Sequence, residues 1–596
     1  MTLLKRGARP PEILGDVPLV PGEPILPILG AAKAQKKRPP SALAVVSLII
    51  LAGLILAPVA TVFYGAFQSD APGLPKNTFS FRAILDVYAS TDYLWPLAGT
   101  LLMAIATSGI AVVLGTVFAW LIARTDMFWR KVLEWGVIVP LFISPFIGAV
   151  AWNILGSPRS GMINTNLRWM LGLDEKTVLV NIGTFPGVVF VMVLYFLPYA
   201  YLLVASSLRN MDPGLEEASY MNGRGIMATA FRVTLPIVRP ALAAAFFMLA
   251  VLATGIFTIP QALGLDTGFT PLGLQVYRKM TVYPFDPPVA ASIGTLLFWF
   301  TLLGIYLYRR SIRNGRRFVT LGGKATRRRS VKLGWARVPA TAFVALYGLL
   351  AAVLPYGALI VMSLTPYAMT DLRKLTLSLD SFVNLVSTPD VFNAFLNTLW
   401  IGLTAPTIAV ILAVAVSYVV VRERGRLGGI LDYISTFPIA VPGIVFATGM
   451  VWLYIRTPLY ATVAILTIAL VAGFMPTAMR FVSTGLMQID PSLEEAARMS
   501  GAGRFRAVFT VTVPLMRPAI LSAWTLLFIF SSREVNETVL LSGPSSRPLA
   551  VLAWNDIDAS DPSAAAAIGL LLTLIMAAGI LLARFVFRTR LDSSNL

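Results

Sequence analysis

The chain has 596 residues, of which 57% are hydrophobic and only 13% are charged, and its mean hydropathy is +0.76. Soluble globular proteins carry about 25% charged residues, so a polar coat over one large core is excluded. Cysteine and histidine are both absent. Their absence excludes disulfides, zinc ligation by Cys or His, and Ser-His-Asp or Cys-His catalysis.

Apolar runs long enough to cross a bilayer recur along the whole chain. About 20 apolar residues span the hydrocarbon core. Prolines inside a run are tolerated because neighbouring helices can satisfy the freed backbone groups. We therefore expect an all-α membrane protein with twelve transmembrane helices, at 41–67, 95–123, 132–155, 184–208, 241–263, 289–308, 338–364, 395–421, 431–455, 459–487, 519–541 and 564–587.

The basic residues set the expected orientation. With a cytoplasmic N-terminus, the large majority of the 48 Lys and Arg residues lie on the cytoplasmic side, whereas the acidic residues divide almost evenly. Positive residues determine orientation while acids contribute little. The net charge of +19 thus indicates topology and contact with anionic membrane lipid. The tract 309–337 could suggest nucleic-acid binding, but it directly follows a span, where basic residues are expected, so we expect no nucleic-acid partner.

One segment of 30 residues occurs twice. Residues 212–241 read DPGLEEASYMNGRGIMATAFRVTLPIVRPA and residues 490–519 read DPSLEEAARMSGAGRFRAVFTVTVPLMRPA, with 16 identical positions and no gap. Such self-similarity indicates duplication. We predict a cytoplasmic N-terminal tail (1–40), a first six-helix domain (41–308), a basic cytoplasmic linker (309–337) and a second six-helix domain (338–590). Both copies of the repeat segment then face the cytoplasm.

Each copy carries signals for a short helix. Asp212 can cap a helix that starts at Pro213, and Gly223 can end it in left-handed geometry. A second amphipathic stretch, 227–233, follows up to Pro236. We expect a helix-turn-helix element in each half. A shared polar surface indicates a shared partner; the alternative is a surface loop duplicated with the rest of the chain.

Three charged residues fall in the predicted span 519–541. Arg533, Glu534 and Glu537 would lie about 20–27 Å along a helix counted from Ala519, towards the outer side. Ions inside a membrane are costly and face a cavity or a partner. They would line a translocation path or its outer gate, or alternatively form a local ion pair near the outer headgroups.

The repeat segments resemble the EAA loop of inner-membrane permeases of binding-protein-dependent ABC importers. That pattern has E-A-A, three residues, Gly, nine residues and I-x-L-P. The first copy matches with Glu217-Ala218-Ser219, Gly223 and Val233 to Pro236, and the second with Glu495-Ala496-Ala497, Gly501 and Val511 to Pro514. Ser219 replaces an Ala, Val233 and Val511 replace Ile, and Val513 replaces Leu.

The resemblance implies two fused six-helix type I ABC importer permease domains in a bacterial inner membrane, with both termini cytoplasmic. The loops would be coupling helices that dock on two cytoplasmic ATP-binding subunits. An extracytoplasmic substrate-binding protein would deliver the solute. The residues implied in coupling are Glu216, Glu217, Ala218, Gly223 and Pro236, and Glu494, Glu495, Ala496, Gly501 and Pro514.

The sequence has no G-x-x-x-x-G-K-[ST] loop, so we expect no cofactor on this chain and ATP hydrolysis on the partner subunits. A fused pair of domains is similar to the ferric-iron permeases, with thiamine, phosphonate and polyamine permeases as alternatives. Arg533 to Thr538 is similar to a K-E-L-P-A-T stretch of that group. A gradient-driven secondary transporter, a membrane enzyme and a scaffold without transport are the competing classes. The few ionisable residues inside spans disfavour the first two.

Overall fold

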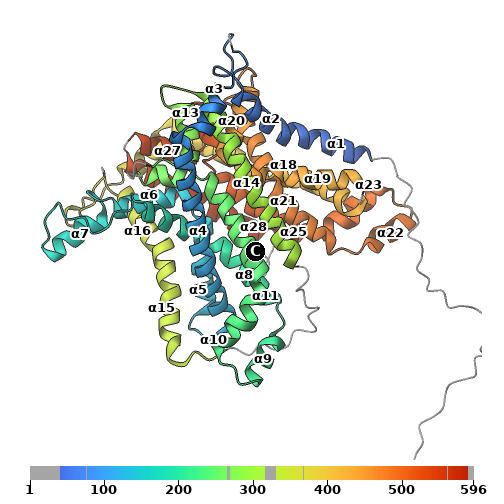
Figure 1. Cartoon of the computed structure of the whole chain (residues 1–596), viewed down its shortest axis with the longest axis horizontal. Coiled ribbons are helices and arrows are strands. Elements are labelled where there is room, and N and C mark those ends of the chain that lie inside the picture. The colour runs from blue at the N-terminus through green and yellow to red at the C-terminus, as the bar shows by residue number, and fades with distance from the viewer. Residues whose placement is uncertain are drawn as a thin grey trace, which may run out of the picture. The chain divides into compact units, whose positions relative to one another are not determined.

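The computed structural model describes residues 41–75, 77–264, 269–315, 331–366, 368–423, 425–559 and 561–587. Within these ranges the chain is almost entirely helical and contains no extended strand, only isolated bridges. The tail 1–40 and most of the predicted linker lie outside the described residues. All helices described below belong to one compact unit, Ala42–Leu596 (Figure 1).

The first half holds the helices up to α14. A π turn, Ala52–Leu56, joins α1 and α2, and another, Ala230–Thr234, joins α10 and α11. The helices are α1 (Ala42–Leu51), α2 (Ala57–Ala66), α3 (Arg82–Ala89), α4 (Thr91–Arg124), α5 (Arg130–Ile138), α6 (Pro145–Gly156), α7 (Met162–Leu171), α8 (Phe185–Asn210), α9 (Pro213–Met221), α10 (Ile226–Thr229), α11 (Leu235–Gly255), α12 (Thr258–Ala262), α13 (Leu272–Thr281) and α14 (Pro287–Gly315).

The second half repeats this order from α15 onwards. Its π turns are Leu349–Val353, Val419–Glu423 and Val508–Thr512. The helices are α15 (Arg337–Gly348), α16 (Leu354–Ser363), α17 (Asp380–Ser387), α18 (Pro389–Tyr418), α19 (Arg426–Thr436), α20 (Gly443–Tyr454), α21 (Val463–Met487), α22 (Pro491–Met499), α23 (Arg504–Ala507), α24 (Val513–Leu515), α25 (Arg517–Ser532), α26 (Thr538–Leu541), α27 (Leu549–Asp558) and α28 (Pro562–Phe587).

The prediction of an all-α protein with twelve transmembrane helices agrees with the structure, whose described residues contain nine to twelve candidate spans. In the described part of the chain, nine helices are long and apolar enough to cross a bilayer unaided. Three further pairs of helices reach that length only together, and they are bent at a short break. Each of the twelve predicted segments overlaps one of these nine helices or three pairs.

Two predicted spans are not continuous helices. Residues 132–155 divide into Arg130–Phe142 and Pro145–Gly156, bent by 100°, and residues 431–455 divide into Arg426–Ala440 and Gly443–Tyr454, bent by 107°. A proline follows Ser144 and Val441, and a residue before proline is displaced from the helical region into extended geometry. Both residues are extended, with ψ values of 125° and 114°.

The prediction of a continuous helix over 519–541 is also wrong. Helix α25 ends at Ser532, residues Arg533 to Glu537 form a turn, and α26 begins at Thr538. The predicted span 241–263 likewise ends early, at Gly255, before the separate short helix α12. The three charged residues therefore lie in a break between helices.

Corresponding helices of the two halves make corresponding contacts. Helix α4 packs along α8 in the first half, and α18 packs along α21 in the second. The halves also interlock, because α2 packs against α20. The Thr61 hydroxyl donates to the carbonyl of Gly449 at 2.8 Å, and a Cβ on Gly449 would lie 2.1 Å from the carbonyl oxygen of Pro58. Only glycine permits this close approach.

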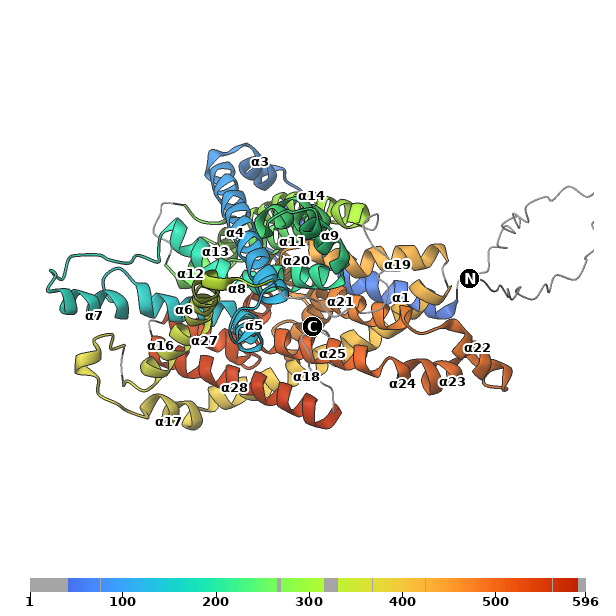
Figure 2. The same cartoon turned by 90° about the horizontal axis from the view of Figure 1, so that it is seen from below.

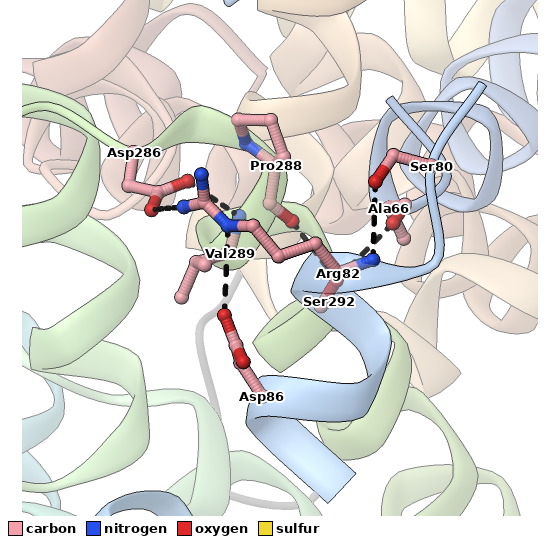
Figure 3. A network of polar contacts seen from close by, with 8 residues as sticks. All are labelled: Ala66, Ser80, Arg82, Asp86, Asp286, Pro288, Val289 and Ser292. Atoms are coloured by element: carbon pink, nitrogen blue, oxygen red, sulfur yellow. Dashed lines mark hydrogen bonds and ion pairs between the residues drawn. The ribbon is translucent and has the colours of Figure 1, made fainter. Parts of the chain in front are cut away.

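A polar cluster fixes the start of α14. Arg82, at the start of α3, donates to Asp286 at 2.5 Å and lies 3.6 Å from Asp86 (Figure 3). The amide of Val289 donates to the same Asp286 carboxylate, which thus caps α14. Helix α7 lies at the outer edge of the described helices in both Figure 1 and Figure 2.

Candidate functional site

The two repeat segments fold as the cap signals predict. The Asp212 carboxylate accepts from the amide of Gly214 at 2.9 Å, and Asp490 accepts from the amide of Ser492 at 2.9 Å. The amide of Ser492 holds the pKa of Asp490 below its usual range. Gly223 and Gly501 follow α9 and α22 with φ values of +75° and +90°, which a side chain would disfavour.

The second part of each segment differs from the prediction. Pro236 does not end a helix, because α11 continues through it to Gly255, whereas α24 ends at Leu515, one residue after Pro514. A proline ring clashes with the carbonyl four residues earlier. In both copies that earlier residue lies inside a π turn, Ala230–Thr234 or Val508–Thr512, which alters the backbone at the point of the clash.

The two copies diverge after the proline. Residues Ile226–Gly255 form one span, whereas Arg504–Leu515 and Arg517–Ser532 meet at a bend of 69°. Figure 1 shows α9 and α22 at separate outer ends of the bundle, each leading into one of these two arms. The duplicated sequence therefore presents two similar short helices on supports of different shape.

Glu216 faces its own chain. Its side chain is buried, with one carboxylate oxygen 3.2 Å from Arg124 Nε and the other accepting from the Thr234 hydroxyl at 2.6 Å. Arg124, at the end of α4, also donates to the carbonyl of Leu208 at 2.9 Å. Glu216 thus anchors α9 to α4 and to the π turn before α11, so any part it has in coupling would act through these contacts within the chain.

Glu494 occupies the equivalent position with other partners. It accepts from the Tyr418 hydroxyl at 2.5 Å and lies 3.5 Å from the Thr512 hydroxyl. Arg422, the counterpart of Arg124, donates to the carbonyl of Ile489 at 2.9 Å. Arg504 pairs with Glu423 beside this contact. A neutral hydroxyl therefore replaces the buried ion pair of the first half.

The other predicted coupling residues lie on the surface. Glu217, Ala218 and Gly223 are exposed in the first copy, as are Glu495, Ala496 and Gly501 in the second. Pro236 is exposed, whereas Pro514 is half-buried. The two short helices thus present one carboxylate each to the solvent side.

Large apolar side chains surround these carboxylates. Met221 and its counterpart Met499 are 88% and 90% exposed. Sequence analysis missed these positions because apolar residues in a membrane protein carry no local signal of their own. Their recurrence at matched positions of both copies could have revealed them. The matched exposed residues are Leu215, Met221, Met227 and Phe231 in the first copy and Leu493, Met499, Phe505 and Phe509 in the second.

A cavity of about 500 Å³ lies between the two halves. Its lining includes Tyr199 from α8 and Thr258 from α12 in the first half. The second half contributes Gly473, Arg480 and the turn that holds the three predicted charges. Arg480 also lies 5.3 Å from the Tyr308 ring centroid.

Arg533 crosses from the second half to the first. Its guanidinium donates to the carbonyl oxygens of Leu141 and Ile143, which the break between α5 and α6 leaves free. The Ser144 hydroxyl lies 3.5 Å from the carbonyl of Arg533. In the described residues Arg533 forms no ion pair with Glu534 or Glu537, contrary to the alternative of a local pair.

The two glutamates border the same cavity. Glu534 accepts from the backbone amide of Asn536 at 2.8 Å and from its side chain at 3.0 Å. In the described structure, one carboxylate oxygen of Glu537 has no hydrogen-bond partner. A Cβ on Gly473 would lie 2.4 Å from the other oxygen, so glycine there makes room for the carboxylate. This arrangement supplies oxygen acceptors to whatever occupies the cavity.

Comparison with known proteins gives a consistent result. The family model described as "Binding-protein-dependent transport system inner membrane component" matches residues 405–590. The chain is 25% identical over 549 residues to the ferric transport system permease protein FbpB of Actinobacillus pleuropneumoniae, covering 90% of this chain and 77% of that relative. It is 24% identical over 567 residues to the probable ABC transporter permease protein y4fN of Sinorhizobium fredii, covering 92% and 97%.

A third relative matches only one part of the chain. The putrescine transport system permease protein PotI of Escherichia coli is 30% identical over 167 residues, which cover 27% of this chain and 59% of PotI. The first two relatives match residues in both halves of the chain.

Proposed function

We propose that the repeat segments 212–241 and 490–519 are the two coupling elements of this chain. The chain belongs with the inner membrane components of binding-protein-dependent transport systems. The chain is a multi-pass permease subunit of an ABC importer, and the relatives named above are transport permeases rather than enzymes. Each coupling element receives one of two cytoplasmic ATP-binding subunits, where ATP is bound and hydrolysed. Both chain termini lie in the cytoplasm, and a substrate-binding protein docks on the opposite side.

The matched surfaces of α9 and α22 carry this proposal. Each presents an exposed carboxylate, Glu217 or Glu495. Each also exposes large apolar side chains at matching positions of the repeat, including Met221 in the first copy and Met499 in the second. Exposed apolar patches with a polar rim mark interaction sites. Lipid cannot explain them, because the carboxylates would then enter the hydrocarbon. Two nearly identical surfaces fit two copies of one partner.

The cavity between the halves fits a translocation path. It is bordered by side chains from both halves, and Arg533 ties the break in the first half to the break in the second. Helices α11 and α25 run from the two coupling elements to the cavity wall. Movement of the coupling elements would therefore separate the break between α5 and α6 from the break between α25 and α26. We assign Arg533, Glu534 and Glu537 to the path.

The substrate we propose is ferric iron, following one of the relatives that match both halves, the ferric transport permease FbpB. Ferric iron prefers hard oxygen ligands, and Glu534 and Glu537 supply carboxylate oxygens at the cavity. In the described residues no group of three or more Asp or Glu side chains is arranged to hold a metal ion, which suits a passage better than a tight site. A polyamine is the second candidate because of the match to PotI.

Purification and uptake together test the function. An ATPase should co-purify with the intact chain, and vanadate should stop uptake into cells or vesicles that contain the binding protein. Radioactive ferric iron and putrescine, supplied separately, distinguish the two substrates. Uptake that persists with vanadate and collapses with the ion gradient would instead identify a secondary transporter.

A further inference from the structure

A second large groove adjoins the cavity between the halves, and Ile305 on α14 lines both. It has a volume of about 900 Å³. It lies between α14, the last helix of the first half, and the segment of the second half that contains α19 and ends at Ala440. Its lining includes Trp299, Leu303 and Tyr306 on α14, which are 53%, 53% and 59% exposed. The groove thus opens outwards, onto the side where a membrane protein meets lipid.

One end of the groove is cationic. Arg309 donates to the Thr436 hydroxyl and lies 4.7 Å from the ring centroid of Tyr433, and Arg310 is exposed beside it. Both arginines line the groove. Thr436 and Tyr433 orient a guanidinium without neutralising it. Among the residues that the structure describes, no ion pair involves Arg309 or Arg310.

The length of the groove along α14 matches the thickness of the hydrocarbon in one leaflet. Trp299 and Arg309 are ten residues apart on the continuous helix α14, which corresponds to about 15 Å along the axis. The hydrocarbon core is about 30 Å thick. A molecule with its charge at Arg309 and its apolar part at Trp299 would therefore extend from the headgroup level to about the middle of the bilayer.

We propose that this groove binds an anionic phospholipid of the cytoplasmic leaflet. The phosphate lies at Arg309 and Arg310, and an acyl chain runs along Leu303 towards Trp299. The cationic end selects an anionic headgroup, and the apolar depth selects a lipid over a free anion. The leaflet assignment rests on the orientation given under the proposed function. Because α14 and α19 belong to different halves, the lipid contacts both.

Native mass spectrometry of the full chain tests the site directly. The protein is taken from detergent into nanodiscs with equal phosphatidylglycerol and phosphatidylcholine of the same acyl chains, and retained lipid is counted. We expect the wild type to retain phosphatidylglycerol, and Arg309→Ala with Arg310→Ala to lose it, with affinity falling about fivefold for each arginine removed. The control Lys131→Ala, an exposed basic residue on α5, should behave as the wild type.

A second variant keeps both arginines and fills the groove. Leu303→Trp should also reduce retention, since the acyl chain loses its place. Equal retention of the two lipids by the wild type, or unchanged retention by the double arginine variant, would overturn the proposal. Unchanged retention by Leu303→Trp would do the same, because the headgroup would then bind without the groove. Lipid retention is measured without partners, so its failure leaves ATPase co-purification and uptake as separate results.

Discussion

Removal of Arg124 should release α9 from the rest of the first half. Arg124 and Glu216 form an ion pair in which the side chains are only 5% and 10% exposed. Breaking such a buried pair by removing one partner costs about 3–5 kcal/mol, because the remaining charge stays buried and uncompensated. Glu216 escapes this penalty if α9 opens. Arg124→Met should therefore favour local opening of α9 by at least about 100-fold.

Hydrogen exchange of the α9 amides measures this opening in the intact protein. Arg422→Met is the matched control, since Arg422 donates to a backbone carbonyl and Glu494 has Tyr418 as its partner. The control loses a hydrogen bond of about 1.5–3 kcal/mol and should affect α22 less. Replacing both Arg124 and Glu216 by methionine should restore most of the protection. Unchanged exchange of the α9 amides in Arg124→Met would show that the ion pair does not hold α9. Exchange as fast in the double variant as in Arg124→Met would show that the unpaired charge is not the cause of opening.

Three further results are expected. Glu217→Arg and Glu495→Arg should each reduce ATPase co-purification and uptake without loss of membrane insertion, and unchanged uptake in both would remove the coupling role. Gly473→Ala should lower uptake because its Cβ would displace the Glu537 carboxylate, whereas Gly357→Ala, with open space around it, should not. Equal uptake rates of the two variants would show that the position of Glu537 does not matter for transport. Arg533→Ala should abolish most uptake at normal expression, and transport at the wild-type rate would show that the contact between the halves is dispensable.

Much of the fold was accessible from the sequence because the signals are repetitive. A run of about 20 apolar residues has few alternatives to a spanning helix, and all twelve predicted segments overlap helices or bent pairs. The caps of α9 and α22 followed from Asp212, Asp490 and the glycines after each helix, since these residue types act locally.

The breaks in the helices could not be placed because they depend on tertiary contacts. Pro240 lies inside the continuous helix α11, whereas the chain bends next to its counterpart Pro518. The turn at Arg533 exists beside the free carbonyls of Leu141 and Ile143, almost 400 residues away in sequence. No local pattern announces such a pairing.

The sequence also did not predict which side chains of α9 and α22 are buried and which are exposed. Glu216 and Glu217 are adjacent acids with the same local signal, yet one is buried against Arg124 and the other is exposed. Arg124 ends α4 and Arg422 lies in the π turn directly after α18, so the two arginines occupy corresponding places, but only Arg124 forms an ion pair among the described residues. Partner choice here is set by packing of α4 and α18, which sequence identity does not report.

The most direct test of the account is the side of the membrane on which the two repeat segments lie. The chain has no cysteine, so Met221→Cys and Met499→Cys each introduce a single thiol at a position 88% or 90% exposed. We expect an impermeant maleimide to label both only in inside-out vesicles, and bound ATPase to protect both. Labelling of the two positions from opposite sides, or labelling that the ATPase leaves unchanged, would contradict the account.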